Sequence, residues 1–258
     1  MRIISLVPSL TETIHSWGLG GSLVGVTKFC VRPPDARMTA AVIGGTKDPN
    51  LDSVKLLRPD LVLADEDENK PEHLTSIQAM GIKVHTTTIE LVEDVARELR
   101  DIGKLVGRQH EAEKMAADLS EAAHHLRGVS RMVPAVRCFV PIWKTPVMTM
   151  GGRTYMNDLL RIAGGANVFD DVTTKKYFTV DTEEVLMRKP DAVLLPTEPY
   201  RFREQDRKFF SERYDIPIDA VRVVDGQAFT WFGAESQHGL RVIGDVIATL
   251  RSVASQTT

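Results

Sequence analysis

The chain contains one short pattern twice, in two widely separated places. Residues 58–64 read Arg-Pro-Asp-Leu-Val-Leu-Ala, and residues 189–195 read Lys-Pro-Asp-Ala-Val-Leu-Leu. Each copy follows a helical stretch that starts with acidic residues, and each is preceded by a Gly-Gly pair of the kind expected at a helix C-terminus, at 20–21 and 164–165. Two echoes in the same order favour two related lobes. The alternative is that any two βαβ units share such a pattern.

Short apolar runs alternate with helical patterns along the whole chain, which is typical of βαβ units and a mostly parallel sheet. The predicted strands cover residues 3–7, 23–26, 61–64, 83–84, 136–140, 192–195 and 221–224. The predicted helices begin at Leu10, where Ser9 and Glu12 match a capping box, and near residues 51, 71, 91, 155, 182 and 237. The fold class is therefore α/β, with mostly parallel sheets.

A proline-free stretch from Leu91 to Arg127 lies between the two copies of the pattern. Apolar residues at helical spacing mark one helix before Gly107 and another after it. The second helix is long enough to run between two domains. We therefore expect an N-terminal α/β lobe at residues 1–108, a single long linking helix at 109–130 and a C-terminal α/β lobe at 131–258.

Composition argues against several classes of protein. The 32 Lys and Arg residues stand against 35 Asp and Glu, a net charge of −3, which argues against a dedicated nucleic-acid binder. Apolar runs stay well short of the roughly 18 residues of a membrane span, and the first residues lack the pattern of a secretory signal. We expect a cytoplasmic monomer without membrane insertion, or a periplasmic protein if a signal was removed.

Aromatic residues gather in the predicted loops. In open parallel sheets, ligands bind beyond the carboxyl ends of the strands. The loops at these ends hold many of the chain's rings, namely Phe29, Trp143, Tyr177, Phe178, Tyr200, Phe202, Phe229, Trp231 and Phe232. Such a distribution predicts a flat-walled cleft for a large, partly apolar ligand. The alternative is that the rings plug the ends of the sheets.

Basic residues in or beside the same loops favour a ligand with negative charge. They are Lys28, Arg32, Lys144, Arg153, Lys175, Lys176, Arg201 and Arg203. Taken with the aromatic residues, they lead to one predicted set of ligand-binding residues: Lys28, Phe29, Cys30, Arg32, Glu66, Trp143, Tyr177, Phe178, Glu198, Tyr200, Trp231 and Phe232.

Signatures of catalysis and of metal binding are weak. The sequence has no phosphate-binding loop, no Gly-x-Ser-x-Gly elbow and no His-Glu-x-x-His motif, so we predict no catalytic residue, no bound metal and no intrinsic cofactor. The acidic run 65–68 could gather a hard cation, but such a run is usually solvated. Cys30 could bind a metal complex as a thiolate, or be a small buried residue.

An ordered set of motifs resembles the cobalamin-binding and ferric-siderophore-binding proteins of ABC importers. The first-lobe motifs lie at residues 2–12, 23–27, 33–37, 44–45, 50–52 and 58–64, and the second-lobe motifs at 151–160 and 163–169. The resemblance covers nearly the whole chain. It implies the class III, or helical-backbone metal receptor, architecture: two Rossmann-like lobes joined by one long helix, with the ligand held between them.

The same resemblance implies a ligand-binding protein without catalysis. Its ligand would be cobalamin, a ferric chelate or another tetrapyrrole-like molecule, and its partner an ABC permease with its ATPase. Members of the family dock on the permease through one surface glutamate per lobe, for which Glu72 is the first-lobe candidate and Glu204 or Glu198 the second-lobe candidate.

Two stretches, 197–202 and 225–233, resemble a leaderless branch of this superfamily. This leaves open an alternative function, a cytoplasmic enzyme or sensor of metal-cofactor metabolism on the same scaffold. Its first candidate residues would be Cys30, Glu66 and Glu198.

Overall fold

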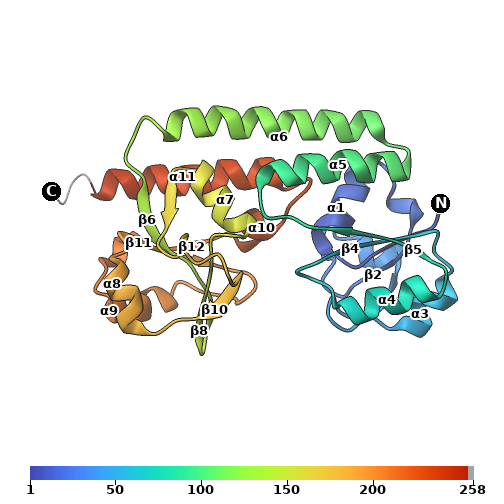
Figure 1. The fold of residues 1–258 in the computed structure, drawn as a ribbon, viewed down its shortest axis with the longest axis horizontal. Coiled ribbons are helices and arrows are strands. Elements are labelled where there is room, and N and C mark those ends of the chain that lie inside the picture. Colours follow the sequence, from blue (N-terminus) through green and yellow to red (C-terminus); the bar gives the residue numbers. More distant parts are fainter. Residues whose placement is uncertain (255–258) are drawn as a thin grey trace. The chain divides into compact units, whose positions relative to one another are not determined.

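The computed structural model describes residues 1–254 as an α/β fold with two compact units (Figure 1), which confirms the predicted fold class. The first unit comprises Met1–Ile89, Asp94–Ala117 and Phe232–Ala234. The second comprises Glu90–Glu93, Asp118–Trp231 and the described residues from Glu235 onward. Within the described part of the chain, no helix is both long and apolar enough to cross a membrane.

The first unit is built on a five-stranded parallel sheet. Its strands follow the order β3 (Ala41–Val42), β2 (Leu23–Val26), β1 (Ile3–Ser5), β4 (Leu61–Asp65) and β5 (Lys83–Thr87). Helices α3 (Leu51–Leu57) and α4 (Pro71–Ala79) cover one face, and α1 (Pro8–Ser16) and α5 (Val92–Val106) lie on the other (Figure 1). A short α2 (Ala36–Thr39) precedes β3. Side chains from the sheet, α3 and α4 form a buried apolar cluster of Ile4, Leu6, Ile43, Val54, Val62, Ala64, Leu74 and Ile77.

The second unit contains two sheets. A four-stranded parallel sheet has the order β12 (Val221–Val224), β11 (Ala192–Pro196), β6 (Val136–Phe139) and β9 (Gly165–Asn167). A three-stranded antiparallel sheet has the order β10 (Tyr177–Thr179), β8 (Val147–Met150) and β7 (Pro141–Lys144). The helices of this unit are α7 (Tyr155–Ile162), α8 (Thr182–Arg188), α9 (Asp206–Tyr214), α10 (Gly226–Thr230) and α11 (Ser236–Ala254).

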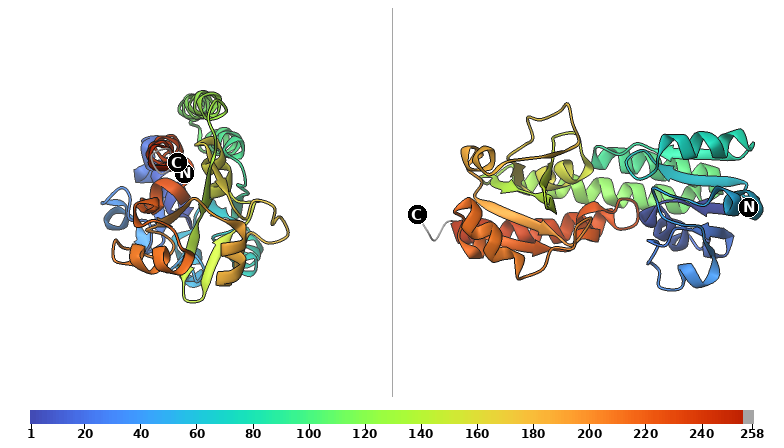
Figure 2. Two further views of the ribbon diagram at one scale, coloured as in Figure 1. Left: turned by 90° about the vertical axis from the view of Figure 1, so that its left-hand side faces the viewer. Right: turned by 90° about the horizontal axis from the view of Figure 1, so that it is seen from below.

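Helix α6 (Gln109–Ser130) covers the range predicted for the linking helix. Residues 109–117 belong to the first unit, where α6 lies beside α5, and 118–130 belong to the second, where it lies beside α11 (Figures 1 and 2). The α5 and α6 backbones approach closely at Gly103, where an added Cβ would lie only 2.3 Å from the Cβ of Ala112. This contact explains why a glycine stands inside α5.

Residues 90–93 also make polar contacts within the second unit. The amide of Val92 donates to Oδ2 of the buried Asp158 at 2.9 Å, and Arg127 pairs with Glu93 at 2.6 Å. Arg153 also holds Glu90, through two hydrogen bonds of 3.0 and 2.9 Å. The start of α5 is therefore anchored in the second unit.

The repeated sequence pattern corresponds to the same local structure in both units. Asn50 and Asp181 cap helices α3 and α8 by accepting the amides of Ser53 and Glu184, both at 2.8 Å. The residue before the shared proline ends each helix in the left-handed region, with φ of 45° at Arg58 and 47° at Lys189. The buried strand that follows is β4 in one unit and β11 in the other.

The shared aspartate of the pattern also plays the same part twice. Asp60 accepts the amide of Arg2 at 2.7 Å, and Asp191 accepts the amide of Arg137 at 2.8 Å. In both units the arginine side chain donates to carbonyls at the end of the preceding helix. The repeat is therefore a structural unit that holds a helix end against the neighbouring strand.

Several sequence predictions of local structure were wrong. The capping box at Ser9 and Glu12 is absent, because Pro8 already starts α1 and its fixed φ favours the first helical position. Helix α1 ends at Ser16 and is followed by Gly18 with φ of 73°, whereas Gly20 and Gly21 form a 3-10 turn. Strands β7 and β10 occupy segments expected to be loops, because a proline and polar residues in or beside them hid the strand pattern.

Candidate functional site

The carboxyl edge of the first unit's sheet brings together loops from neighbouring strands. Strands β2, β1 and β4 are adjacent and parallel, so the residues that follow β2 and β4 lie at one edge. Lys28, Phe29, Cys30 and Arg32 follow β2, and Glu66 follows β4. The predicted first-unit ligand residues therefore share the edge where ligands bind in such sheets.

Phe29 and Lys28 form an exposed pair at this edge. The Lys28 Nζ lies 5.2 Å from the centre of the Phe29 ring, and half of the Phe29 surface is exposed, at 50%. Arg37 donates to the carbonyl of Lys28 at 3.1 Å, and Arg32 lies 4.0 Å from Oε1 of Glu12. A ring with a neighbouring cation can contact a flat ligand that carries negative charge.

Cys30 does not face solvent. Its side chain is fully buried, and the hydroxyl of Thr11 donates to its sulfur at 3.0 Å, with Thr27 Oγ1 at 3.3 Å. Burial raises the pKa of the Cys30 thiol above its ordinary value, so it is a neutral thiol near pH 7. The structure thus favours the alternative in which Cys30 is a small buried residue.

The polar groups of the acidic loop after β4 form hydrogen bonds within the protein. Asp65 is buried, and its carboxylate accepts the Thr87 hydroxyl at 2.7 Å and the Asp67 amide at 2.9 Å. Burial raises the pKa of Asp65 to about 6. Asn69 closes the loop by accepting the Asp65 amide, and Glu66 accepts the Thr88 hydroxyl at 3.0 Å. Among the described residues, no group of three or more His, Cys, Asp or Glu side chains is arranged to hold a metal ion.

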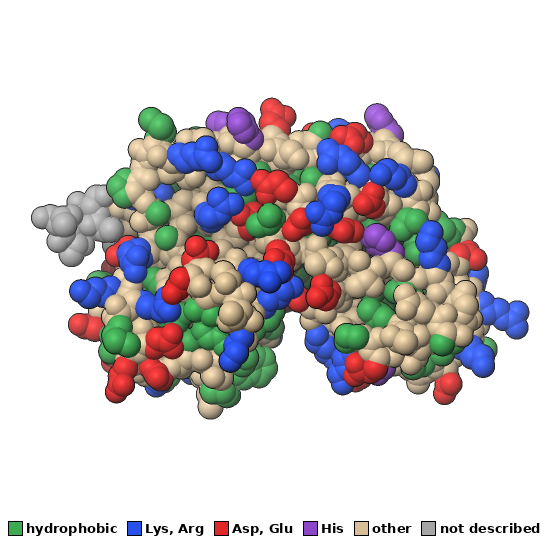
Figure 3. Space-filling model, in the orientation of Figure 1, with side chains coloured by type: hydrophobic (Ala, Val, Ile, Leu, Met, Phe, Trp, Pro, Cys, Tyr) green, Lys and Arg blue, Asp and Glu red, His purple; other side chains and the backbone are tan. Residues whose placement is uncertain are grey.

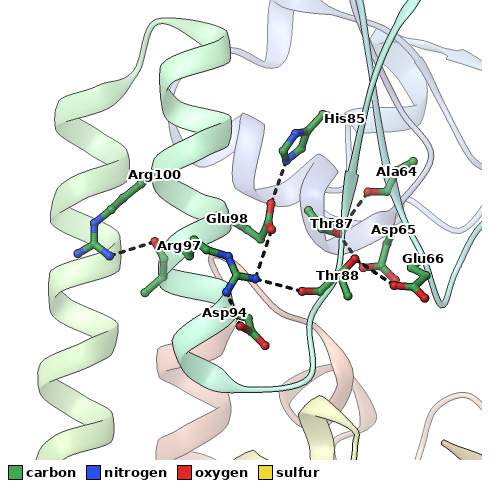
Figure 4. A network of polar contacts seen from close by, with 11 residues as sticks. Ala64, Asp65, Glu66, His85, Thr87, Thr88, Asp94, Arg97, Glu98 and Arg100 are labelled. Carbon is green, nitrogen blue, oxygen red and sulfur yellow. Dashed lines mark hydrogen bonds and ion pairs between the residues drawn. The ribbon is translucent and has the colours of Figure 1, made fainter. Parts of the chain in front are cut away.

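Helix α5 supports this edge through the polar network in Figure 4. His85 of β5 lies 2.9 Å from Oε2 of Glu98, and Arg97 donates to the carbonyl of Thr88 at 3.4 Å and to Asp94 at 2.5 Å. Strand β5 is an edge strand, so these side chains supply ties that a second neighbouring strand would otherwise give. The network fixes the end of β5 next to the acidic loop.

In the second unit, an aromatic group lies at the carboxyl edge of the parallel sheet. Trp143 follows β6 in the chain and Tyr200 follows its neighbour β11. The two rings pack edge to face, with centres 5.3 Å apart. Tyr200 also packs against Phe202, with ring centres 4.6 Å apart. Trp143 is 42% exposed and Tyr200 is half-buried, whereas Phe202 is buried in the core. We call Trp143 and Tyr200 the aromatic pair.

Glu198 and Trp231 are brought together at the same edge. Trp231 is buried, and its indole nitrogen donates to Glu198 Oε2 at 3.0 Å. Gln227 donates to the other carboxylate oxygen at 3.2 Å. Both oxygens of Glu198 thus accept hydrogen bonds within the protein, so this carboxylate connects the loops that follow β11 and β12.

Lys144 is tied to the start of α9. Its Nζ lies 2.5 Å from Oδ1 of the buried Asp206, whose Oδ2 accepts the amide of Arg203 at 2.8 Å. Burial acts to raise the pKa of Asp206, but the hydrogen bonds from Lys144 and the Arg203 amide outweigh it and hold the pKa below its usual range. The positive charge of Lys144 is therefore largely neutralised by Asp206 within the protein.

Other predicted ligand residues lie apart from the aromatic pair. Tyr177 and Phe178 lie on β10, at the opposite edge of the antiparallel sheet from the strand of Trp143, and Phe178 packs against Phe169 at 5.7 Å. On the face in Figure 3, hydrophobic side chains gather where Figure 1 places β8 and β10. Phe229 and Phe232 are buried. The burial of Phe202, Phe229, Trp231 and Phe232 favours the alternative that these rings plug the ends of the sheets.

The two candidate docking glutamates differ in their surroundings. Glu72 is exposed in the first turn of α4. Glu204 is also exposed, and its carboxylate accepts a hydrogen bond from Arg207 at 3.1 Å. Of the predicted basic residues, Arg153 is engaged with Glu90, and Lys176 lies 3.8 Å from the same carboxylate.

A groove of about 560 Å³ lies elsewhere, at the amino ends of β4 and β5. Ligands of parallel sheets bind at the opposite ends of the strands. The groove is therefore separate from the loops described above. It is lined by Lys55, Arg58, Pro59, Ala79, Met80 and Ile82.

The sequence interpretation missed Asp206 and Gln227, the partners of Lys144 and Glu198 at the second-unit edge. Asp206 begins α9, a charged helix without an apolar stripe, and Gln227 lies in the short α10. The one usable signal was Asp225, which caps α10 by accepting the Gln227 amide at 2.9 Å.

Comparisons with known proteins agree with this architecture. The family model described as "Periplasmic binding protein" matches residues 3–213. The vitamin B12-binding protein of Photorhabdus laumondii is 29% identical over 195 residues, which cover 76% of this chain and 70% of that protein. The vitamin B12-binding protein of Vibrio cholerae O1 El Tor Inaba is 25% identical over 255 residues, which cover 99% and 91%.

Solved structures share the fold. The periplasmic vitamin B12 binding protein BtuF of Vibrio cholerae superposes with a TM-score of 0.80 at 22% identity, covering 97% of this chain and 96% of its own. The periplasmic heme-binding protein RhuT from Roseiflexus sp. RS-1 gives a TM-score of 0.82 at 20% identity, covering 98% of each chain.

Proposed function

The chain belongs to the periplasmic binding protein family, and from this premise we propose that it binds a large, flat, metal-chelating ligand of the tetrapyrrole or ferric-chelate class. Cobalamin is the first candidate, because vitamin B12-binding proteins are among the relatives of this chain. Haem is the second, because heme-binding proteins share its fold.

The observation that carries the proposal is the aromatic pair. Trp143 and Tyr200 lie beyond the carboxyl ends of two neighbouring parallel strands, and Trp143 keeps 42% of its surface exposed. An exposed, well-held tryptophan at this edge offers a large apolar face to a ligand. The exposed Phe29, with Lys28 beside it, offers a second such face at the corresponding edge of the first unit.

The surroundings of the candidate catalytic residues support ligand binding without catalysis. Cys30 is a buried, neutral thiol, and Glu198 has both carboxylate oxygens engaged by protein donors. Glu66 accepts a hydroxyl of Thr88. These three residues are the first candidates for a nucleophile or base in the alternative function as an enzyme, and the surroundings of Cys30 and Glu198 favour a structural part for those two.

We propose a periplasmic location and an ABC permease with its ATPase as partner, because the family is that of periplasmic binding proteins. Glu72, exposed at the start of α4, is the proposed docking residue of the first unit. Glu204 is the proposed docking residue of the second unit, and its partner Arg207 would have to release it on docking.

The test is to purify the protein from its native host and to measure its absorbance and its intact mass under non-denaturing conditions. A bound corrinoid, haem or ferric chelate would support the proposal. Calorimetric titration of the ligand-free protein with cyanocobalamin, haemin and a ferric siderophore should then give a Kd of about 1 µM or tighter for one of them. Absence of binding to every member of this panel would overturn the proposal.

A further inference from the structure

Asp206 connects the two elements that carry the aromatic pair. Its Oδ1 pairs with Lys144, the residue after Trp143, and its Oδ2 accepts the amide of Arg203, in the same loop as Tyr200. The amide of Asp206 also donates to the carbonyl of Arg203 at 2.8 Å. One side chain therefore ties the β7 strand and the loop of Tyr200 to the start of α9.

Regular backbone pairing holds the two elements only in part. Strand β7 is an edge strand, hydrogen-bonded to β8 on one side. Residues 201–203 have no regular secondary structure. Side-chain ties therefore contribute to where Trp143 and Tyr200 lie relative to each other. The Lys144 Nζ, 4.9 Å from the centre of the Phe209 ring, adds a second contact to α9.

The Asp206 carboxylate is suited to this task because it is 5% exposed and bound by a cation and a backbone amide. A buried carboxylate with fixed partners has few alternative positions, whereas an exposed ion pair exchanges with water. Removing its charge would leave Lys144 beside a neutral group and free the β7 strand to shift.

We propose that Asp206 is a positioning residue for ligand binding, which sets the edge-to-face arrangement of Trp143 and Tyr200 without touching the ligand. The inference rests on the proposed function for its effect on affinity. It also makes a structural claim about the two rings that can be tested without any ligand.

The experiment compares Asp206→Asn, Trp143→Ala and the double variant with the unaltered protein, using the panel ligand that binds best. Asp206→Asn keeps the size of the side chain and an acceptor for the Arg203 amide, so it removes mainly the pairing with Lys144. We expect it to weaken binding about tenfold, the scale on which groups that orient contact residues act. In the Trp143→Ala background it should have a clearly smaller effect, because Tyr200 is then the one ring of the pair that remains to be positioned.

Near-ultraviolet circular dichroism reports on the rings directly. Asp206→Asn should reduce the aromatic signal that Trp143→Phe also removes, and Asp206→Glu, which keeps the charge, should restore part of it. The matched control is Asp245→Asn, which breaks the exposed pair with Arg241 at 3.7 Å in the same unit and should leave both affinity and spectrum unchanged.

Two results would overturn the inference. One is an unchanged aromatic spectrum in Asp206→Asn. The other is an equal loss of affinity from Asp206→Asn with and without Trp143, which would mark a general structural effect. Failure of the unaltered protein to bind any panel ligand would instead overturn the proposed function, and the spectrum would still decide the part played by Asp206.

Discussion

Glu198 accepts the indole N–H of Trp231 at 3.0 Å and the amide N–H of Gln227 at 3.2 Å, one on each carboxylate oxygen. Glu198 follows β11, and the two donors follow β12, its neighbour in the sheet. The carboxylate therefore joins the loops beyond two adjacent strands. A side chain predicted to face a ligand or a partner thus also holds this edge of the sheet together.

Replacing Glu198 by alanine should destabilise the protein by about 1–3 kcal/mol, because the buried Trp231 indole loses its acceptor and Gln227 loses its partner. Urea unfolding followed by circular dichroism measures the change. Glu204→Ala is the matched control, since its side chain is 73% exposed and should contribute within about 0.5 kcal/mol. Equal effects of the two substitutions would contradict the part given to Glu198.

Much of the fold could be predicted from the sequence. The strands β1, β2, β4, β6, β11 and β12 are short apolar runs with clear boundaries, and α7 and α8 begin at the residues predicted for them. The repeat around Pro59 and Pro190 identified two related lobes because it encodes a cap, a left-handed residue and a buried strand together. Local sequence suffices where one segment determines its own structure.

The candidate site was predictable only in part. Position after a strand placed Trp143, Tyr200, Glu198 and Trp231 at one edge. Whether a ring faces solvent or the core depends on tertiary packing, which is why Phe202 and Trp231 are buried while Trp143 is exposed. The tie from Lys144 to Asp206 spans 62 residues and left no local pattern to read.

Gly103 should tolerate no side chain. In an exposed helix, Gly→Ala gains up to about 1 kcal/mol, but a Cβ here would lie 2.3 Å from that of Ala112. We expect Gly103→Ala to cost about 1–3 kcal/mol through overpacking of α5 against α6, as measured by thermal or urea unfolding. Gly128→Ala, at a site with no atom within 4 Å, should be neutral or stabilising. A stabilising Gly103→Ala would refute the close approach of the two helices.

Asp65 should make stability depend on pH in a direction unusual for a carboxylate. Burial raises its pKa from 3.8 to about 6 in the folded state, so folding favours the protonated form. This contribution is fully present below pH 3.8 and is lost as the pH rises through about 6. The free energy of unfolding of Asp65→Asn minus that of the unaltered protein should therefore be about 2–3 kcal/mol larger at pH 7 than at pH 4.

Denaturation curves at several values of pH between 4 and 7 measure this difference. Asp52→Asn, at an exposed position of the same unit, serves as the control for general loss of negative charge. A difference between Asp65→Asn and the unaltered protein that does not vary with pH would show that Asp65 titrates normally.

Both cysteines should be unreactive in the folded protein. Cys30 and Cys138 are fully buried, and burial raises the pKa of each thiol. A thiol reagent such as Ellman's reagent should modify them only on unfolding, and in guanidinium it should titrate two thiols per chain. Rapid modification of Cys30 in the folded protein would instead indicate an accessible thiolate and would revive its candidacy as a ligand or nucleophile.

We expect the exposed Trp143, with Tyr200 beside it, to contact a flat metal-chelate ligand, and a titration of the unaltered protein and of Trp143→Ala tests this contact most directly. The unaltered protein should bind cyanocobalamin, haemin or a ferric siderophore with a Kd of about 1 µM or tighter. Trp143→Ala should weaken that binding by at least about tenfold, as loss of a central tryptophan contact does, whereas Trp17→Phe, at a buried position in the first unit, should not. Unchanged affinity in Trp143→Ala would contradict the contact between Trp143 and the ligand, and no binding by the unaltered protein would contradict the proposed function.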